Sequence, residues 1–490
     1  MIKLGNQTLT ALPSGVAGPS YDRSAVRVGI VHFGVGGFHR AHQAMYLDRL
    51  MNDGLALDWG ICGVGIMESD KRMRDALNGQ DGLYAMVVKN PDGRYDARVI
   101  GSIVRYLYAP DDPEAVIETM TAPEVRIVSL TITEGGYNFD HVTGEFVFET
   151  PVVARDLTGK DAPATVFGLV SEALRRRRER GIVPFTVMSC DNIQGNGDVA
   201  RAMFCSFAER KDPDLGAWMR KNVAFPNAMV DRITPVTAPS DIKQVADRFG
   251  IDDAWPVVCE PFTQWVLEDH FPAGRPPYEK AGVQLVADVV PYELMKLRLL
   301  NASHQGLTYF GYLAGYRFAH EVTQNPLFTD FLLGYMKEEA MPTLDPVPGI
   351  DLDEYCRTLI DRFSNPEVRD TLARLCAESS DRIPKWLLPV VRSQLASGGE
   401  IRRSAGIVAS WARYAEGVDE QGQPIDIVDR LKDSLVKIAA GNRAEPTAFI
   451  ANRAVFGDLI DQPRFVEAYV RVLHSLHEKG ALETVRMLTR

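Results

Sequence analysis

The stretch "AVRVGIVHFGVGGFHRAH", residues 25–42, places a run of apolar and β-branched residues directly before a cluster of glycines and a helix-like segment. This strand–turn–helix order is the setting of a dinucleotide fingerprint, since glycine allows a tight turn and lets backbone N–H groups approach a pyrophosphate. Gly34 and Gly36 supply two glycines of the fingerprint, whereas His39 stands where the third would fall. An ordinary strand–helix turn and a dinucleotide site both remain open at this point.

Donor side chains follow these glycines at the start of residues 37–52, which we expect to form a helix. A cluster of donors beside a glycine turn suits an anionic ligand, although His42 alone is equally explained as a histidine satisfied within the helix. The expected cofactor-binding set is Gly34, Gly36, Gly37, Phe38, His39, Arg40 and His42.

Further strands are predicted at residues 59–66, 125–133 and 184–190, with helical segments between them. Strands that alternate with helices indicate an α/β domain with a parallel sheet. After about residue 290 strand signals become scarce, and long apolar-periodic segments indicate a mainly α-helical second domain. Its expected helices span residues 292–318, 327–341, 352–363, 366–377 and 402–416. Because Pro291 suits the first turn of a helix, we place the domains at 1–290 and 291–490.

An acidic residue follows the second predicted strand, where dinucleotide-binding folds hold a carboxylate against the ribose hydroxyls. Asp70 occupies this place, further from the glycine turn than the usual separation of about 20 residues. A carboxylate there repels the extra phosphate of NADP, so we expect NAD. Glu68 is an alternative, and either residue is also explained as a cap of the following helix.

Composition excludes several classes of function. A formal net charge of -11 over 490 residues disfavours nucleic-acid binding, which needs a basic surface. The one basic run, residues 175–180, resembles the solvated end of a helix closed by Gly181. The six cysteines lack the spacing of zinc sites or disulfide frameworks, so we expect reduced, buried thiols. No signal peptide or spanning helix is predicted, which indicates a soluble cytoplasmic protein.

The segment "PYELMKLRLLNASH", residues 291–304, contains two competing catalytic patterns. Tyr292 and Lys296 have the tyrosine–lysine spacing of short-chain dehydrogenases. The spacing of the glycine turn, the chain length and the absence of a serine from residues 275–290 all contradict that pattern. We therefore expect Tyr292 to be an ordinary residue of the first helical turn.

Lys296 itself lies among leucines and a methionine, a setting that desolvates an ammonium group and lowers its pKa toward that of a general base. On a continuous α-helix, Asn301 would lie about 140° and His304 about 80° around the axis from Lys296. All three then project from one side of the helix. Taken alone, the segment is better explained by a surface lysine beside an asparagine and a core histidine.

Polar residues also follow two predicted strands, at the carboxyl ends where parallel sheets bind ligands. Asn192 follows the strand at 184–190, where its amide suits an alkoxide, although Asp-Asn pairs also occur in plain turns. Glu134 follows the strand at 125–133, next to a glycine pair.

Motifs along the whole chain resemble those of the polyol-specific long-chain dehydrogenases, the mannitol dehydrogenase family. The segment "VAFPNAMVDRITP", residues 223–235, resembles the family signature. "GVGGFHRAHQA", "SLTITEGGY", "FTVMSCDN", "DDAWPVVCEPF", "NASH", "GVDE" and "RFSNP" occur in the family's order. One departure is "IMES" before Asp70, where relatives can carry a second acid, so the strictness of NAD over NADP stays open.

The resemblance implies an N-terminal Rossmann-type domain that binds NAD, a mainly α-helical C-terminal domain and a substrate groove between them. It implies Lys296 as general base, Asn192 and Asn301 as donors to the alkoxide, and His304 as an orienting residue. It further implies that Asp231 and Arg374 hold polyol hydroxyls and that Glu134 lines a proton path. No metal ion is required, since a neutral lysine with amide donors manages the same charges.

The implied reaction is oxidation of D-mannitol to D-fructose with NAD, or its reverse, by a cytoplasmic monomer. The alternatives are another polyol, such as D-arabinitol or D-sorbitol, or a hexuronate as in fructuronate and tagaturonate reductases. A catalytically silent NAD-binding sensor is a different class of function, and it would have no need of Lys296, Asn192, Asn301 and His304 together.

Overall fold

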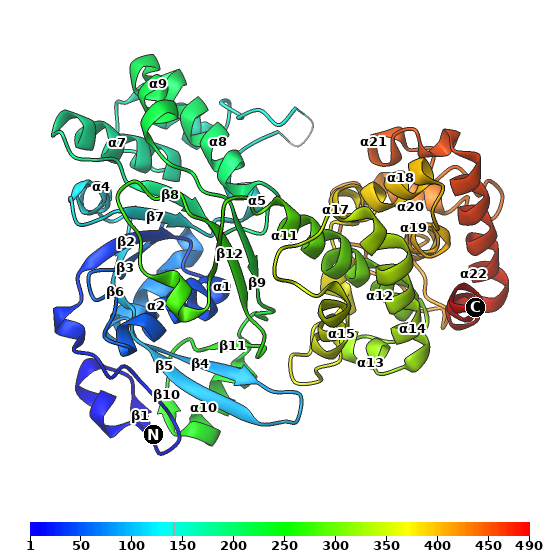
Figure 1. Ribbon diagram of the computed structural model, residues 1–490, viewed down its shortest axis with the longest axis horizontal. Helices are drawn as coiled ribbons and strands as arrows, with labels where there is room; N and C mark the ends of the chain where they lie inside the picture. Colours follow the sequence, from blue (N-terminus) through cyan, green and yellow to red (C-terminus); the bar gives the residue numbers. More distant parts are fainter. Residues whose placement is uncertain (141–142) are drawn as a thin grey trace. The chain divides into compact units, whose positions relative to one another are not determined.

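The computed structural model describes residues 1–140 and 143–490 and divides into two compact units, Met1–Val289 and Val290–Arg490 (Figure 1). Each unit has its own secondary-structure class. In the described residues, every strand belongs to the first unit, whereas the second consists of helices and loops. The predicted fold class, an α/β domain followed by a mainly α-helical one, is confirmed.

The central sheet of the first unit is parallel and has the strand order β6-β3-β2-β7-β8. Chain order runs outward from β2 in one direction through β3 and β6, then restarts beside β2 with β7 and β8. This reversal is the topological switch point of a Rossmann-type sheet. The strands are β2 (Val28–Phe33), β3 (Gly60–Gly65), β6 (Ile103–Tyr108), β7 (Ile127–Leu130) and β8 (Thr186–Ser189).

Both faces of this sheet are buried, which explains why its strands are nearly continuous apolar runs. Along β2, Val31 and Phe33 pack on one face with helices α4, α7 and α8. Ile30 packs on the opposite face with helix α2 (Gln43–Asn52). The helices around the sheet are α3 (Lys71–Asn78), α4 (Pro113–Thr121), α5 (Thr133–Gly136), α6 (Pro151–Thr158), α7 (Val166–Glu179), α8 (Asn196–Lys211), α9 (Pro213–Asn222) and α10 (Pro239–Phe249).

The helix predicted at residues 37–52 is interrupted in the structure. It forms α1 (Gly37–Ala41) and α2 (Gln43–Asn52), and His42 between them has φ -125° and ψ -97°. The imidazole Nε2 of His42 lies 3.0 Å from the carbonyl oxygen of Gln264, on a strand distant in sequence. This tertiary contact accompanies a break that local sequence does not predict.

Smaller sheets complete the first unit. Strands β9 (Ala228–Asp231), β12 (Gln264–Glu268) and β13 (Gln284–Val286) form one of them, with β12 in the middle. Another has β4 (Tyr84–Lys89) between β5 (Tyr95–Ile100) and β11 (Val257–Cys259), and β1 (Ile2–Lys3) pairs with β10 (Ile251–Asp252). The signature segment at residues 223–235 therefore supplies β9, an edge strand of its sheet.

The basic run at residues 175–180 ends helix α7, as predicted, and Gly181 follows in the left-handed region with φ +67°. Arg176 and Arg180 pair with Glu118 of α4. Arg177 departs from the predicted solvated face, because it is only 1% exposed. Its guanidinium donates to the carbonyl oxygens of Met120, Ala122, Val125 and Val183. This buried side chain therefore caps the C-terminal end of α4. All six cysteines are free and buried, as expected.

The second unit is built from helices of very different length. Its α-helices are α11 (Val290–Met295), α12 (Ala302–Leu313), α13 (Ala319–Thr323), α14 (Pro326–Gly334), α15 (Leu352–Phe363), α16 (Leu372–Cys376), α17 (Ser379–Trp386), α18 (Leu388–Ser397), α19 (Arg402–Tyr414), α20 (Lys432–Ala439), α21 (Arg453–Phe456) and α22 (Pro463–Thr489). The helix predicted at 366–377 shrinks to α16. Arg369 has φ +53°, a left-handed conformation that ends any regular helix before Leu372.

The helix predicted at residues 292–318 is also not a continuous α-helix. A π-helical turn, η5 (Lys296–Asn301), separates α11 from α12. A second π turn, η6 (Tyr335–Ala340), follows α14. The angles predicted for an ideal α-helix between Lys296, Asn301 and His304 are therefore wrong, because the wider turn changes the angular spacing of the residues it contains. Turns of this kind inside helices frequently mark functional sites.

Candidate functional site

The glycine turn lies where β2 ends, at the switch point of the parallel sheet. Gly34 has φ +87°, and a Cβ atom there would lie 2.1 Å from the carbonyl oxygen of Thr131. The Thr131 hydroxyl donates back to the Gly34 carbonyl oxygen at 2.7 Å. Gly36 is different, because a Cβ there would come no nearer than 3.8 Å to any atom. The backbone therefore requires glycine at position 34. At Gly36, at the start of α1, the absence of a side chain leaves the backbone accessible to a ligand.

The predicted donors after this turn point into the protein. His39, Arg40 and His42 are each at most 1% exposed. Arg40 donates to the carbonyl oxygens of Trp255 and Gly36, the latter at 3.3 Å. These contacts use the guanidinium to hold the turn and α1 in place. A direct contact of the three side chains with a cofactor stays a prediction.

A buried histidine that was not predicted from the sequence packs against α1, the helix that follows the glycine turn. His32, in β2, stacks on His39 with ring centroids 3.4 Å apart. Its ring nitrogens lie 2.7 Å from the Ser129 hydroxyl and 2.9 Å from that of Thr131, both contributed by the β7 segment. Burial lowers the pKa of His32 to about 3 and that of His39 well below its usual value. Both rings are therefore neutral at pH 7 and bring no positive charge to the turn.

Asp70 lies at the end of a short 3-10 helix after β3. Its Oδ2 accepts hydrogen bonds from the backbone N–H groups of Ile66 and Met67, each at 2.9 Å. Within the described part of the chain, Oδ1 receives no hydrogen bond. The carboxylate is thus fixed at the carboxyl end of β3 with one oxygen left to accept. The alternative acid, Glu68, is 82% exposed in its side chain and pairs with Lys71 at 2.8 Å.

The ends of β7 and β8 are joined by a carboxylate that sequence reasoning did not single out. Asp191 accepts from the backbone N–H groups of Ile132 and Thr133 at 3.1 and 2.8 Å, and from the Tyr137 hydroxyl at 2.8 Å. Burial raises its pKa to about 6, against the lowering effect of these hydrogen bonds. Asp191 therefore fixes the turn that carries Glu134, which is partly buried, and precedes Asn192, which is exposed.

Two further residues fix this region without having been predicted. Asn196 donates to the carbonyl oxygens of Asp191 and Ala228 at 2.9 and 2.8 Å and accepts from the Ala228 N–H at 2.9 Å. It thereby ties the end of β8 to the start of β9. Arg232, next to the predicted Asp231, donates to the carbonyl oxygen of Ala41 at 2.7 Å. Asp231 itself ends β9 and is 5% exposed.

Lys296, Asn301 and His304 lie within nine consecutive residues of the second unit, on η5 and the first turn of α12. They are 7%, 4% and 8% exposed. The His304 ring lies against Phe363, with centroids 4.3 Å apart. The buried Nδ2 of Asn301 has no hydrogen-bond partner among the described residues. A buried amide donor without an acceptor is costly, so this arrangement suits an acceptor supplied by a ligand.

Tyr292 is only 1% exposed in α11. Its hydroxyl donates to the carbonyl oxygen of Pro348 at 2.8 Å. The phenol therefore anchors a loop, in agreement with its expected structural role.

Arg374, in α16, is exposed and forms a bidentate ion pair with Asp370, at 2.8 Å from Nε and 2.6 Å from Nη2. This pairing fixes the plane of the guanidinium.

Family models match nearly the whole chain. The mannitol dehydrogenase Rossmann domain matches residues 28–280, and the mannitol dehydrogenase C-terminal domain matches residues 288–477. The chain belongs to the mannitol dehydrogenase family. Membership confirms the resemblance and assigns the glycine turn to the family's Rossmann domain and the Lys296 cluster to its C-terminal domain.

Curated relatives within the mannitol dehydrogenase family are similar over their length. A mannitol 2-dehydrogenase of Emericella nidulans is 46% identical over 99% of this chain and 98% of its own. One of Phaeosphaeria nodorum is also 46% identical, over 99% of this chain and 85% of its own.

Two solved structures are likewise similar. Pseudomonas fluorescens mannitol 2-dehydrogenase, in a ternary complex with NAD and D-mannitol, is 47% identical with a TM-score of 0.89 and covers 99% of both chains. A D-sorbitol dehydrogenase in substrate-free form is 38% identical with a TM-score of 0.92, over 98% of this chain and 100% of its own.

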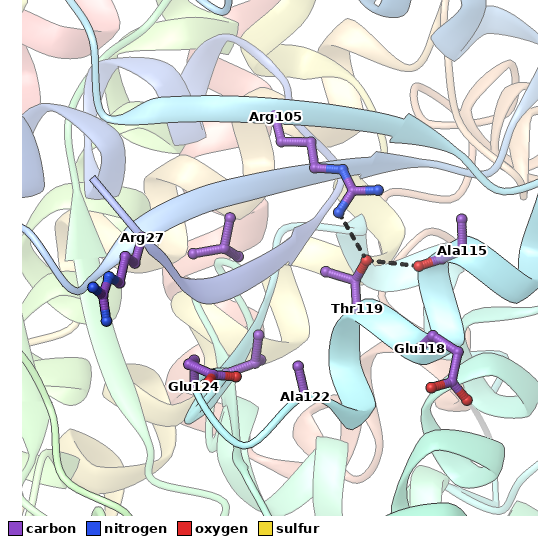
Figure 2. Close-up of a pocket in the computed structure, with 9 residues that line it drawn as sticks. Arg27, Arg105, Ala115, Glu118, Thr119, Ala122 and Glu124 are labelled. Atoms are coloured by element: carbon purple, nitrogen blue, oxygen red, sulfur yellow. Dashed lines mark hydrogen bonds between the residues drawn. The ribbon is translucent and has the colours of Figure 1, made fainter. Parts of the chain in front are cut away.

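This member of the mannitol dehydrogenase family also has a hollow of about 700 Å³ away from the glycine turn (Figure 2). Its lining includes Val28 at the start of β2, Arg105 near the start of β6 and Glu118 in α4. It therefore lies at the amino ends of the strands, opposite the edge where such sheets bind ligands.

Among the described residues, no group of three His, Cys, Asp or Glu side chains is arranged to hold a metal ion. None of the described helices is both long enough and apolar enough to span a membrane.

Proposed function

We propose that this chain is an NAD-dependent polyol dehydrogenase that interconverts D-mannitol and D-fructose, with Lys296 as general base. The observation that carries the proposal is the buried pair on η5. Lys296 is 7% exposed, and the amide of Asn301 is buried without an acceptor among the described residues. A base and a donor held together in a desolvated segment are what removal of a hydroxyl proton requires.

Side chains of this protein carry out the proton transfer. Burial of Lys296 beside Met295 and Leu299, both fully buried, favours the neutral amine over the ammonium ion. The neutral Nζ accepts the proton of the secondary hydroxyl. Asn301 Nδ2 then donates to the oxygen as negative charge develops on it, which lowers the barrier more than binding the neutral alcohol would. NAD, when bound, supplies the acceptor for the hydride that leaves the carbon.

The remaining assignments follow the sequence prediction. Asn192 acts as a second donor to the alkoxide, and His304 orients the substrate or Lys296. Asp231 and Arg374 hold further hydroxyls, and Glu134 carries the proton toward solvent. A carboxylate and a guanidinium suit a polyol because each can bind two neighbouring hydroxyls.

The first unit fits NAD on its own features. Gly34 is required by the backbone, while a side chain at Gly36 would project into unoccupied space, as close approach of a pyrophosphate requires. Asp70 keeps Oδ1 available to accept from a ribose hydroxyl, and its negative charge disfavours a 2′-phosphate. We therefore propose NAD rather than NADP as the preferred cofactor.

A second substrate, D-sorbitol, has specific support, because the similar D-sorbitol dehydrogenase shares this fold over nearly the whole chain. Initial rates with D-mannitol, D-sorbitol, D-arabinitol, D-fructose and a hexuronate, each with NAD and NADP, distinguish these substrates. D-mannitol is expected to give the highest kcat/KM. A higher value for another polyol would replace the substrate but keep the chemistry.

Replacement of Lys296 by alanine tests the mechanism. We expect polyol oxidation to fall by about 10²- to 10⁴-fold at every accessible pH, because a general base contributes a factor of about that size to the rate. NADH binding, followed by its fluorescence, is expected to survive. Lys437→Ala is the matched control, since it removes an exposed lysine of α20. Retained turnover in Lys296→Ala would refute the lysine-base mechanism.

We further propose that the protein is a cytoplasmic monomer that acts on small molecules and needs no metal ion. The net charge of -11 supports a soluble chain without affinity for nucleic acid. Sedimentation velocity tests the monomer, and full activity after dialysis against a chelator tests metal independence.

A further inference from the structure

The π turn that carries Lys296 leaves one backbone carbonyl without its helical partner. At the end of η5, the Ala302 N–H donates to the carbonyl oxygen of Leu297, five residues earlier. In an α-helix this N–H would donate to Arg298, four residues earlier. The carbonyl oxygen of Arg298 thus loses its donor in a segment whose other residues are buried, where an unpaired acceptor is unfavourable.

A tyrosine from a different helix supplies the missing donor. The hydroxyl of Tyr335 donates to the Arg298 carbonyl oxygen at 3.0 Å. Tyr335 is 0% exposed and is the first residue of η6, the other π turn of this unit. Burial raises its pKa well above the usual value, so the hydroxyl keeps its proton and remains a donor at any working pH.

The side chain of Arg298 is held by the segment that follows η6. Its Nη1 donates to the carbonyl oxygen of Thr343 and lies 3.0 Å from the Thr343 hydroxyl. That hydroxyl donates to the carbonyl oxygen of Ala340 at 2.6 Å. Backbone and side chain of Arg298 are therefore both fixed from the η6 region.

The alternative to the π turn is a register slip by one residue. Ala302 would then bond to Arg298, and the residues before the turn would rotate by about 100° relative to those after it. Lys296 is the first residue of the turn and Asn301 the last, whereas His304 lies after it in α12. The register of η5 therefore sets the position of the lysine relative to its two partners.

We propose that Tyr335 is a positioning residue, whose hydroxyl holds η5 in the π register and so places Lys296 beside Asn301 and His304. The proposal rests on the proposed function for its effect on catalysis, but not for its effect on the backbone. Tyr335 touches neither substrate nor cofactor in this role, and acts through the Arg298 carbonyl group.

Tyr335→Phe removes only the hydroxyl. We expect kcat to fall by about 10- to 100-fold, the effect of a misplaced catalytic group, with the KM for NAD unchanged. A more solvated Lys296 has a higher pKa, so the pH of half-maximal kcat is expected to rise. A purely structural tyrosine would lower the unfolding midpoint and leave this pH dependence unchanged.

The control is Tyr469→Phe, which removes another fully buried hydroxyl of the second unit, one that has no hydrogen-bond partner among the described residues. It is expected to leave kcat and its pH profile as in the unaltered chain. Hydrogen exchange of a peptide spanning residues 296–302 gives a readout independent of activity. It is expected to quicken in Tyr335→Phe alone.

The outcomes separate the two proposals. Unchanged exchange and an unchanged pH profile in Tyr335→Phe would overturn the positioning role. Faster exchange in Tyr335→Phe together with full activity in Lys296→Ala would support the role in the backbone and overturn the lysine-base mechanism instead.

Discussion

Replacement of Gly34 by alanine tests the glycine turn at its most constrained point. Two costs add in this variant. A residue with a side chain at φ +87° pays about 1–2 kcal/mol for the left-handed conformation. The new Cβ atom would also lie 2.1 Å from the Thr131 carbonyl oxygen, and overpacking of this kind costs about 1–3 kcal/mol. We expect the free energy of unfolding to fall by about 2–5 kcal/mol.

Gly54→Ala separates the two costs. Gly54 has φ +74°, and no atom lies within 4 Å of the position that a Cβ would take, so alanine there meets only the conformational cost. Urea unfolding of both variants, with the slope checked for constancy, gives the difference that the clash alone contributes. Equal losses of stability in the two variants would refute the steric argument.

Gly34→Ala also tests cofactor binding. Relief of the clash requires the turn or the Thr131 backbone to move, which displaces the backbone N–H groups that follow Gly34. We expect the Kd for NADH to rise at least about tenfold, a loss of about 1.4 kcal/mol, in fluorescence titrations. Gly54→Ala is expected to bind NADH normally. Undiminished affinity in Gly34→Ala would show that the turn does not hold the cofactor.

Two other predictions concern carboxylates of the first unit. Because burial raises the pKa of Asp191 from 3.8 to about 6, the stability that its protonated form contributes is complete below pH 3.8 and is lost as pH rises through about 6. The stability difference between the unaltered chain and Asp191→Asn, measured by urea unfolding from about pH 3.5 to about pH 7, should therefore shrink with rising pH, and a constant difference would contradict the raised pKa. Asp70→Asn keeps an oxygen for the two backbone N–H groups but removes the negative charge. We expect the ratio of kcat/KM for NAD over NADP to fall by about 10-fold or more, and an unchanged ratio would assign cofactor choice to another residue.

Local sequence predicted those parts of the fold that depend on neighbouring residues. The apolar runs of β2, β3, β7 and β8 are buried on both faces, so their composition alone identifies them. Gly34 was predicted because a tight turn at a strand end needs a glycine. Lys296, Asn301 and His304 were recognised as a group because they lie close together in sequence. Their assigned roles remain predictions of the mechanism.

Features that depend on distant residues were missed. The break at His42 accompanies a contact with Gln264, and the π turn at Lys296–Asn301 accompanies the donor supplied by Tyr335. Arg177 was assigned to a solvated face because its neighbours are arginines, yet the carbonyl groups around it come from other segments of the chain. Nothing local distinguishes such residues from their neighbours, since only the tertiary fold brings their partners near.

The long-range contacts around α1 also bear on when the chain acquires its cofactor site. Arg40 bonds to Trp255, 215 residues later, and Arg232 reaches back 191 residues to Ala41. His42 meets Gln264 across 222 residues. During synthesis from the N-terminus, the glycine turn therefore emerges early but its supports emerge late. These contacts cannot form until the segment around Gln264 has left the ribosome, so the fully supported turn is complete only near the end of the first unit's synthesis.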